Sequence, residues 1–259
     1  MIDAATAAAA LIQARLDYTV LETFPGGTYP ADLAEGYAVL DSIAAQFGVA
    51  VGGWKVALTN QAAMQRMNTD APAVGPLFQP YIMTSPQLLN LPAEAGLGLE
   101  CEFAFRMGGH LPTRNEAYTA EEVLAAAASL HPAIEVVDSR LADRAKHGAP
   151  AVIADHCGNA AFIHGEGMTD WRRLDLAGHK VALSVNGEHK VTGVGSEVLG
   201  DPRQSLVWMA NFLRVRGKGL KAGDWVTTGS TMGICPAPPG STATADFGAL
   251  GQVEVSFTA

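Results

Sequence analysis

The chain opens with hydrophobic positions at helical spacing. Residues 4–20 are rich in strong helix formers, and residues 30–47 (PADLAEGYAVLDSIAAQF) repeat apolar side chains at helical intervals, with Gly48 just past the end. This pattern predicts two helices and an N-terminal helical region over residues 1–50. Residues 51–259 are expected to form the main body, either as a separate unit or as one continuous domain with the helices.

After residue 50, apolar and polar positions alternate, which is typical of strands. A hairpin is expected over residues 176–193, because its Asn186-Gly187 pair suits a type I′ turn. The other expected strands are GGWKVALT (52–59), LGLECEFAF (97–105), KAGDWVTTGSTMG (221–233, ending in a loop) and ALGQVEVSF (249–257).

Three helices are expected among these strands. One begins near Thr59 or Asn60, one covers residues 119–130 and opens with the capping box Thr119 and Glu122, and one covers residues 201–217. Helices at the N-terminus and mostly strands beyond them predict an α+β fold with an antiparallel or mixed sheet.

Composition and charge exclude several classes of protein. With 48% hydrophobic residues in 259, the chain has ample material for a core, and its net charge of −9 argues against a nucleic-acid partner. No apolar run reaches the roughly 20 residues that a membrane span needs. Cys101, Cys157 and Cys235 are widely spaced, which fits neither a disulfide framework nor a zinc site. A cytoplasmic protein without a membrane partner is therefore expected.

The strand LGLECEFAF carries an unusual pair of acids. Glu100 and Glu102 lie on one face, about 6 to 7 Å apart, and repel unless water, a base or a cation lies between them. Glu135 interrupts the apolar run 133–137. Three converging carboxylates would make an all-oxygen site for a hard divalent cation. Alternatively, the pair lies on a solvated face and Glu135 binds a neighbour such as Arg140, which spacing alone favours.

Other polar residues are candidates for binding or catalysis. Lys55 shares its face with small residues, so it could bind a substrate carboxylate or transfer protons, although an exposed lysine on an edge strand is an equal alternative. The loop 227–233 offers N–H groups and hydroxyls to an anion. His156 and Asn159 could line a pocket or belong to a structural hydrogen-bond network.

Taken in chain order, Lys55, the Glu100 and Glu102 pair, Glu135 and the glycine-rich loop resemble the fumarylacetoacetate hydrolase superfamily. The branch most similar is that of the 2-keto-4-pentenoate hydratases and 4-oxalocrotonate decarboxylases. The resembling segments include GGWKVALTN, VGPLF, LECEFAF, LHPAIEVVDSR, IADHCGNAAF, LKAGDWVTTGS and DFGALGQVEVSF.

The resemblance implies a mixed β-sandwich or β-roll body and a homo-oligomeric lyase that acts on small 2-oxo or 2-hydroxydienoic acids from aromatic catabolism. Hydration of a 2-hydroxypenta-2,4-dienoate-like substrate is the leading expectation. The alternatives are decarboxylation of an oxalocrotonate-like acid, carbon–carbon hydrolysis of a 2,4-dioxo acid, or non-catalytic binding of a small acid. The implied site residues are Glu100, Glu102 and Glu135 for magnesium or manganese, Lys55 and His156 for catalysis, and Phe78, Asn159, Thr228 and Ser230 for the substrate.

The chain departs from that pattern in three places. Many members of the branch carry an acidic residue shortly after VGPLF, where this chain has Gln79 and Pro80. They often read DNAS where this chain reads DHCG (155–158). The carbon–carbon hydrolases tend to have a histidine before the paired acids, where this chain has Leu99, and this difference counts against hydrolysis.

Overall fold

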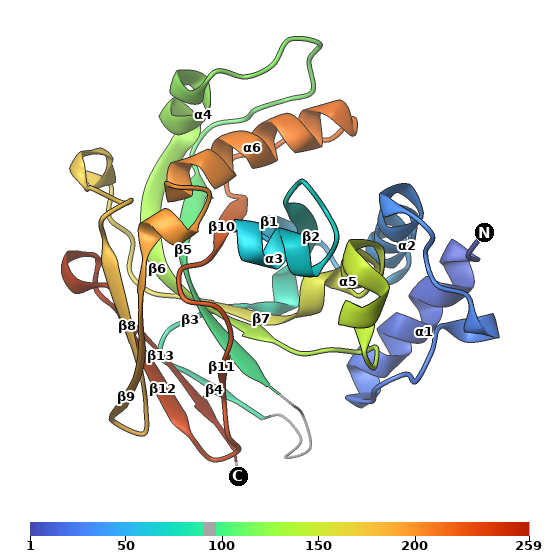
Figure 1. Cartoon of the computed structure of the whole chain (residues 1–259). Coiled ribbons are helices and arrows are strands. Elements are labelled where there is room, and N and C mark those ends of the chain that lie inside the picture. Colours follow the sequence, from blue (N-terminus) through green and yellow to red (C-terminus); the bar gives the residue numbers. More distant parts are fainter. Residues whose placement is uncertain (91–96, 259) are drawn as a thin grey trace.

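The computed structural model describes residues 1–90 and 97–258 as two sheets with helices around them (Figure 1). The α-helices are α1 (Ala4–Asp17), α2 (Leu33–Gln46), α3 (Gln61–Arg66), α4 (Ala120–Ala126), α5 (Gly148–Ala154) and α6 (Pro202–Val215). The strands are β1 (Val51–Ala57), β2 (Ala73–Phe78), β3 (Ile82–Thr84), β4 (Gln87–Leu89), β5 (Gly98–Met107), β6 (Ala127–Val137), β7 (Asn159–His164), β8 (Lys180–Val185), β9 (Glu188–Val194), β10 (Trp225–Ser230), β11 (Cys235–Pro236), β12 (Thr242–Asp246) and β13 (Gln252–Phe257).

The larger sheet is mixed. Its strand order is β2-β1-β10-β5-β6-β7-β3, with β11 paired to β5. The pairs β1–β10 and β3–β7 are parallel, and the others are antiparallel. The smaller sheet has the order β4-β13-β12-β8-β9. Mixed sheets combined with helices confirm the expected α+β class. Within the described ranges, no helix combines the length and apolarity that crossing a bilayer requires.

The N-terminal helices form where the hydrophobic pattern predicts them. Asp3 caps α1 by accepting hydrogen bonds from two backbone N–H groups, and Asp32 caps α2 by accepting one from the Glu35 N–H. Their buried faces, which include Leu11 and Val39, share an apolar cluster with Phe78 of β2 and with residues of α5. The helical region therefore packs directly on one edge of the larger sheet, and Figure 1 shows both helices on that side of the molecule.

The helix expected over residues 119–130 is too long. The capping box of Thr119 and Glu122 is present and α4 begins as predicted, but the helix ends at Ala126 and β6 starts at Ala127. Residues 127–130 pair with β5 instead, with Leu130 opposite Phe105. Alanine favours helices only by tenths of a kcal/mol over most residues, so ladder formation and burial override the local preference.

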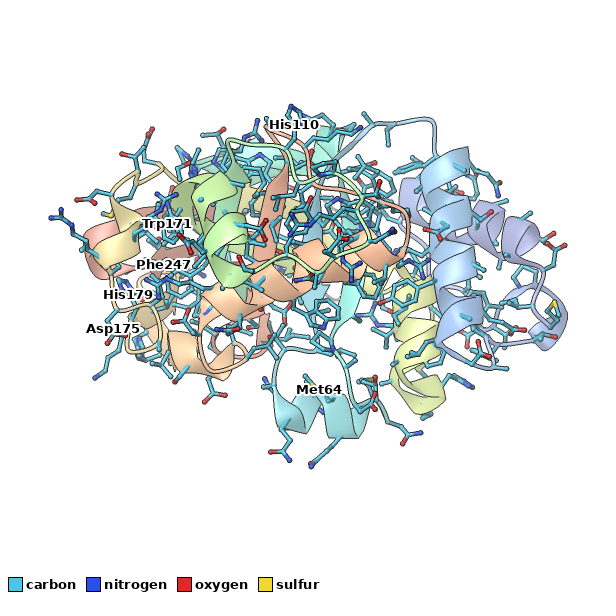
Figure 2. The ribbon with its side chains drawn as sticks, turned by 90° about the horizontal axis from the view of Figure 1, so that it is seen from above. Met64, His110, Trp171, Asp175, His179 and Phe247 are labelled. Carbon is cyan, nitrogen blue, oxygen red and sulfur yellow. The ribbon has the colours of Figure 1, made fainter. Side chains whose placement is uncertain are left out.

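The two faces of β5 have different surroundings, and both are covered. The side chains at odd-numbered positions are buried against other parts of the chain: Phe103 contacts His179 and Phe247 edge-on, and Phe105 contacts Trp171. Figure 2 shows Trp171, His179 and Phe247 together on the side of the molecule away from α1 and α2. The even-numbered side, which carries the paired acids, faces the opposite way.

The larger sheet curls around that even-numbered side. Lys55 on β1 reaches Glu135 on β6 even though β10 and β5 lie between those strands. Next to this ion pair, five residues from five strands form a separate apolar cluster, which we call the plug: Leu77, Ala104, Ala133, Phe162 and Trp225. We call the surface that carries the plug and the ion pair the enclosed face.

Candidate metal centre and active site

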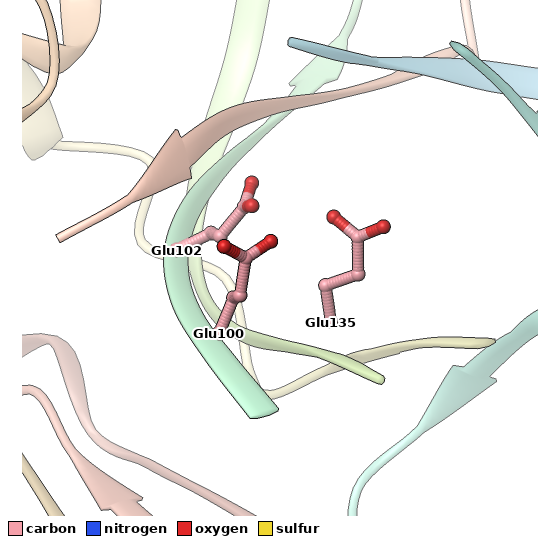
Figure 3. Close-up of side chains that lie close together, drawn as sticks. All are labelled: Glu100, Glu102 and Glu135. Carbon is pink, nitrogen blue, oxygen red and sulfur yellow. The ribbon is translucent and has the colours of Figure 1, made fainter. Parts of the chain in front are cut away.

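Three carboxylates converge on the enclosed face (Figure 3). Glu100 and Glu135 are direct partners in the β5–β6 ladder, so their side chains share a face, and Glu102 follows two residues along β5. One oxygen from each lies within 4.8 Å of the others. Glu102 is 1% exposed and Glu135 is 0% exposed. The alternative of a solvated acidic face is therefore wrong for Glu102, and Glu100 beside it is partly buried.

The protein holds one oxygen of each buried glutamate and leaves the other open. Glu102 Oε2 accepts a hydrogen bond from the Gly229 N–H at 2.9 Å. Glu135 Oε1 accepts from Lys55 Nζ at 2.6 Å and from Asn159 Nδ2 at 3.0 Å. Glu102 Oε1 and Glu135 Oε2 are buried without a hydrogen-bond partner among the described residues. A buried carboxylate oxygen without a partner is costly, so this donor set fits a hard divalent cation such as Mg²⁺ or Mn²⁺.

Glycine is required where β10 passes Glu102. Gly229 has φ of 101°, and a Cβ there would lie 2.3 Å from Thr59 Oγ1. A side chain at this position would strain the backbone and displace Thr59, and both effects would move the N–H that holds Glu102. The glycine of the TTGS segment thus serves the carboxylate rather than a free anion.

Lys55 is a central buried group and not an exposed edge lysine. Its strand β1 lies between β2 and β10, and the residue is 1% exposed. Besides Glu135, its Nζ donates to the carbonyl oxygen of Cys157 at 3.2 Å. A Cβ at Gly75 would lie only 3.2 Å from Lys55 Cγ, so the glycine makes room for the lysine stem.

Electrostatics at the site favour an added cation. Burial opposes protonation of Lys55, but attraction to Glu135, Glu100 and Glu102 exceeds that effect and raises its pKa. Burial raises the pKa of Glu100 to about 7, against the attraction of Lys55, and raises the pKa of Glu102 well above its usual range. With all three acids ionised and Lys55 protonated, the site carries two excess negative charges, which a divalent ion balances.

Cation affinity should consequently depend on pH. Below pH 7 Glu100 takes up a proton, and the raised pKa of Glu102 adds to the competition between protons and the cation. Competition weakens binding by about tenfold per pH unit for each displaced proton. We expect the dissociation constant for Mn²⁺, measured calorimetrically at constant ionic strength, to rise by at least about tenfold from pH 8 to pH 6. A constant affinity over this interval would contradict the expectation.

The segment 155–160, which we call the strap, runs from the end of α5 into the first two residues of β7 and carries two contacts to the site. These are the Cys157 carbonyl to Lys55 and the Asn159 amide to Glu135. Asp155 anchors the strap through ion pairs with Arg140 at 2.9 Å and Arg144 at 2.6 Å. The expected alternative of an Arg140–Glu135 pair is therefore wrong. Asn159, which was expected to bind the substrate, lies beside Glu135.

Two predicted site residues lie in the wall behind the site. The ring of His156 is buried, its Nε2 donates to the Pro76 carbonyl oxygen, and its Cδ2 lies beside Gly75, across from the Lys55 stem. Burial, together with repulsion from Arg15 and Arg140, places the pKa of His156 well below its usual range, so the ring is neutral. Phe78 packs on His156 and Phe47 beneath the N-terminal helices and is not brought to the carboxylates.

The two predicted residues of β10 have different positions. Ser230 is the ladder partner of Glu102, but its hydroxyl donates to Gly233 O at 2.9 Å. Thr228 is not brought to the site, because its hydroxyl donates to Phe103 O at 3.0 Å. Thr227, which sequence reasoning missed, is the ladder partner of Lys55, and its buried Oγ1 has no hydrogen-bond partner among the described residues.

Strand alternation alone did not single out Thr227, since two adjacent threonines point to opposite faces and the sequence does not say which one faces inward.

Gln79, which stands where many members of the branch carry an acidic residue, is not among the residues that converge on the acidic triad. Gln79 is exposed in the turn after β2, and its side chain lies against Gly52.

An acidic triad and an ion-paired lysine on the enclosed face of a curled mixed sheet define a candidate divalent-cation site. The family model described as fumarylacetoacetate (FAA) hydrolase C-terminal matches residues 54–258. The chain belongs to the fumarylacetoacetate hydrolase family, as its resemblance implied.

Individual relatives narrow the comparison. The chain is 30% identical to the 2-keto-4-pentenoate hydratase of Paraburkholderia xenovorans over 240 residues, which cover 91% of this chain and 86% of that protein. It is 32% identical to the 2-hydroxyhexa-2,4-dienoate hydratase of Comamonas testosteroni, covering 82% of this chain and 80% of the relative. The 4-oxalocrotonate decarboxylase from Pseudomonas putida G7, complexed with magnesium and adipate, superposes with a TM-score of 0.88 at 27% identity, covering 98% of this chain and 97% of that one.

Proposed function

We propose that this protein is a metal-dependent lyase that acts on small 2-oxo or 2-hydroxydienoic acids, with hydration of a 2-hydroxypenta-2,4-dienoate-like substrate as its main reaction. One observation carries the proposal: Glu102 and Glu135 each present a buried, unpartnered oxygen beside an ion-paired Lys55. The hydratases and the decarboxylase to which the chain is similar act on acids of this class by name, and the decarboxylase binds magnesium and an organic acid.

Each residue has a defined task in this proposal. Glu100, Glu102 and Glu135 would hold Mg²⁺ or Mn²⁺, which supplies Lewis-acid stabilisation of the negative charge that develops on the 2-oxo group. An ammonium group has three donors, and Glu135 and Cys157 O each take one from Lys55, so one is left for a substrate carboxylate. Because its pKa is raised, Lys55 carries a proton at Nζ before the reaction, and its task is to hold the substrate carboxylate and supply a hydrogen-bond donor there.

The surroundings keep these groups in place. Asn159 fixes the held oxygen of Glu135, and the apolar plug excludes water from one side of the site. We propose His156 and Phe78 as the supporting wall, because the Nε2–H of His156 is engaged by Pro76. Ser230, the ladder partner of Glu102, also lines a cavity of about 380 Å³ with Asn60, Thr192, Glu197 and Met232, and we propose this cavity as the place of the substrate's tail because of that one shared residue.

Thr227 and Thr228 offer a matched pair of substitutions. We expect Thr227→Val to raise KM about tenfold, because the unpartnered hydroxyl is free to bind substrate, and to leave the free energy of unfolding unchanged or higher. Thr228→Val should instead cost about 1 kcal/mol of stability through the lost bond to Phe103 O and leave KM unchanged. Steady-state kinetics and urea unfolding test both. A Thr227→Val variant with normal KM and reduced stability would assign Thr227 a structural role only.

Other chemistry is open to the same site, and substrate assays separate the alternatives. Purified protein with Mg²⁺ is tested against 2-hydroxypenta-2,4-dienoate, oxalocrotonate and an acylpyruvate. Loss of dienol absorbance without carbon dioxide release supports hydration, carbon dioxide release supports decarboxylation, and cleavage of the acylpyruvate alone supports carbon–carbon hydrolysis. Absence of turnover with all three, combined with tight binding of the acids, would favour a non-catalytic binder.

We further propose that the two sheets form the β-roll or β-sandwich body of the family, that residues 1–50 and 51–259 act as one catalytic unit, and that the protein is a cytoplasmic homo-oligomer. Support for oligomerisation comes from exposed apolar side chains at the end of α1 and on β4, namely Leu16, Tyr18, Val20 and Leu88. Light scattering coupled to gel filtration measures the oligomeric state, and a monomer at micromolar concentration would exclude it.

A further inference from the structure

The side chain of Arg15 on helix α1 reaches the strap. Arg15 lies in the last turn of α1, and its guanidinium donates from Nη1 to Asn159 O and from Nη2 to Ala160 O at 2.6 Å. The guanidinium lies over the ring of Tyr81 at 4.1 Å, which fixes its plane. A residue 144 positions away in sequence therefore holds the backbone of the same Asn159 whose amide binds Glu135.

The hydrogen bond from Arg15 to Asn159 O brings two positively charged side chains close together. Arg140 Nη1 also donates to Asn159 O, at 3.1 Å, so two guanidinium groups converge on one carbonyl oxygen. Burial and the repulsion of Arg140 lower the pKa of Arg15 to about 10, which leaves it charged at neutral pH. Like charges approach in this way only when the shared acceptors and a counter-charge offset the repulsion, and Asp155 supplies that charge through Arg140.

The chain of contacts continues into the cation site. Asn159 Nδ2 and Lys55 Nζ bind the same oxygen of Glu135, and the other oxygen of that carboxylate is open. A shift of the strap would turn the Glu135 carboxylate and move the open oxygen. Residues that orient a ligand in this way change metal affinity by about 10- to 100-fold when they are removed.

We propose that Arg15 is a positioning residue for the cation site, so that the N-terminal helical region, which lies outside the matched family segment 54–258, is a working part of the active site. The inference rests on the metal site proposed above. Arg15 acts through Asn159 and Glu135 and does not touch the cation or the substrate.

The test measures Mn²⁺ affinity of the full-length protein by calorimetry, well below the unfolding temperature. Arg15→Met should weaken binding about tenfold, and Arg15→Lys, which retains a single donor group, should fall between Arg15→Met and the wild type. Arg66→Met is the control, because Arg66 is an exposed arginine at the end of another helix, α3, and it should leave affinity unchanged.

A double-mutant cycle separates positioning from packing. If Arg15 acts through the Asn159 amide, Arg15→Met should change affinity less than about twofold in an Asn159→Ala background. The inference is overturned if Arg15→Met lowers the melting temperature but binds Mn²⁺ as tightly as wild type, or if its full effect persists without the Asn159 amide. Should Arg15→Met not fold, wild-type affinity in Arg15→Lys overturns it equally. Failure of the wild type to bind Mn²⁺ would instead refute the proposed metal site.

Discussion

Glu102→Gln is expected to weaken Mn²⁺ binding by more than about a hundredfold, the upper end of the loss seen when only a supporting residue is removed. The variant keeps the side-chain length and an oxygen for the Gly229 N–H, but it removes one charge and one open carboxylate oxygen. Catalytic turnover should be lost with the metal. Calorimetric titration and an activity assay at saturating substrate measure the two effects.

Glu102→Gln should weaken Mn²⁺ binding without lowering the thermal stability of the cation-free protein. Because burial raises the pKa of Glu102 well above its usual range, this carboxyl lowers the stability of the cation-free fold above the pKa that it has in the unfolded chain, and therefore at neutral pH. In the presence of a chelator, Glu102→Gln should therefore melt at the same temperature as wild type or higher, while wild type alone gains stability on adding Mn²⁺. Glu254→Gln, at an exposed strand position on β13, is the matched control. A variant that melts lower and still binds Mn²⁺ would refute the ligand role.

Lys55→Met should have the largest effect on the cation-free protein. It leaves Glu135 buried beside two other acids without its ion-pair partner, and loss of one member of a buried pair costs about 3–5 kcal/mol. Added Mn²⁺ should restore part of this loss, because it supplies the missing positive charge. The stabilisation by Mn²⁺ is then larger in the variant than in wild type, which differential scanning calorimetry measures with and without chelator.

Activity of Lys55→Met should fall by about 10²- to 10⁴-fold even with metal bound, since the variant lacks the proton at Nζ and the donor for the substrate carboxylate. Lys218→Met is the control: its pair with Asp41 is half-exposed and is worth at most about 1 kcal/mol. Near-normal turnover of the metal-saturated Lys55→Met protein would remove Lys55 from the reaction and leave it a structural role only.

The sequence pattern within one segment was sufficient to predict elements whose conformation depends mainly on that segment. Helices α1, α2 and α6, the hairpin at Asn186-Gly187 and the alternation along β5 follow from periodicity, caps and turn residues. The pattern also placed Glu100 and Glu102 on one face. It failed at residues 127–130, where the strand β5 decides the conformation and the helix-forming alanines do not.

The site itself needed the tertiary structure. Spacing favoured an Arg140 partner for Glu135, because Arg140 is close in sequence, but curling of the sheet brings Lys55 to Glu135 and leaves Arg140 to Asp155. The register between β1 and β10 selects Thr227 over Thr228 as the partner of Lys55, and hydrogen bonds to the strap bring Arg15 of α1 beside Asn159.

By itself, therefore, the sequence determined the elements of this protein and, through an ordered set of residues, its family. Only the tertiary structure decided which acids are buried and which oxygen of each has no hydrogen-bond partner. It also decided that Lys55 is the basic residue that pairs with Glu135. The reason is that desolvation and ion pairing depend on distances between strands far apart in the chain, and periodicity within one strand carries no information about them.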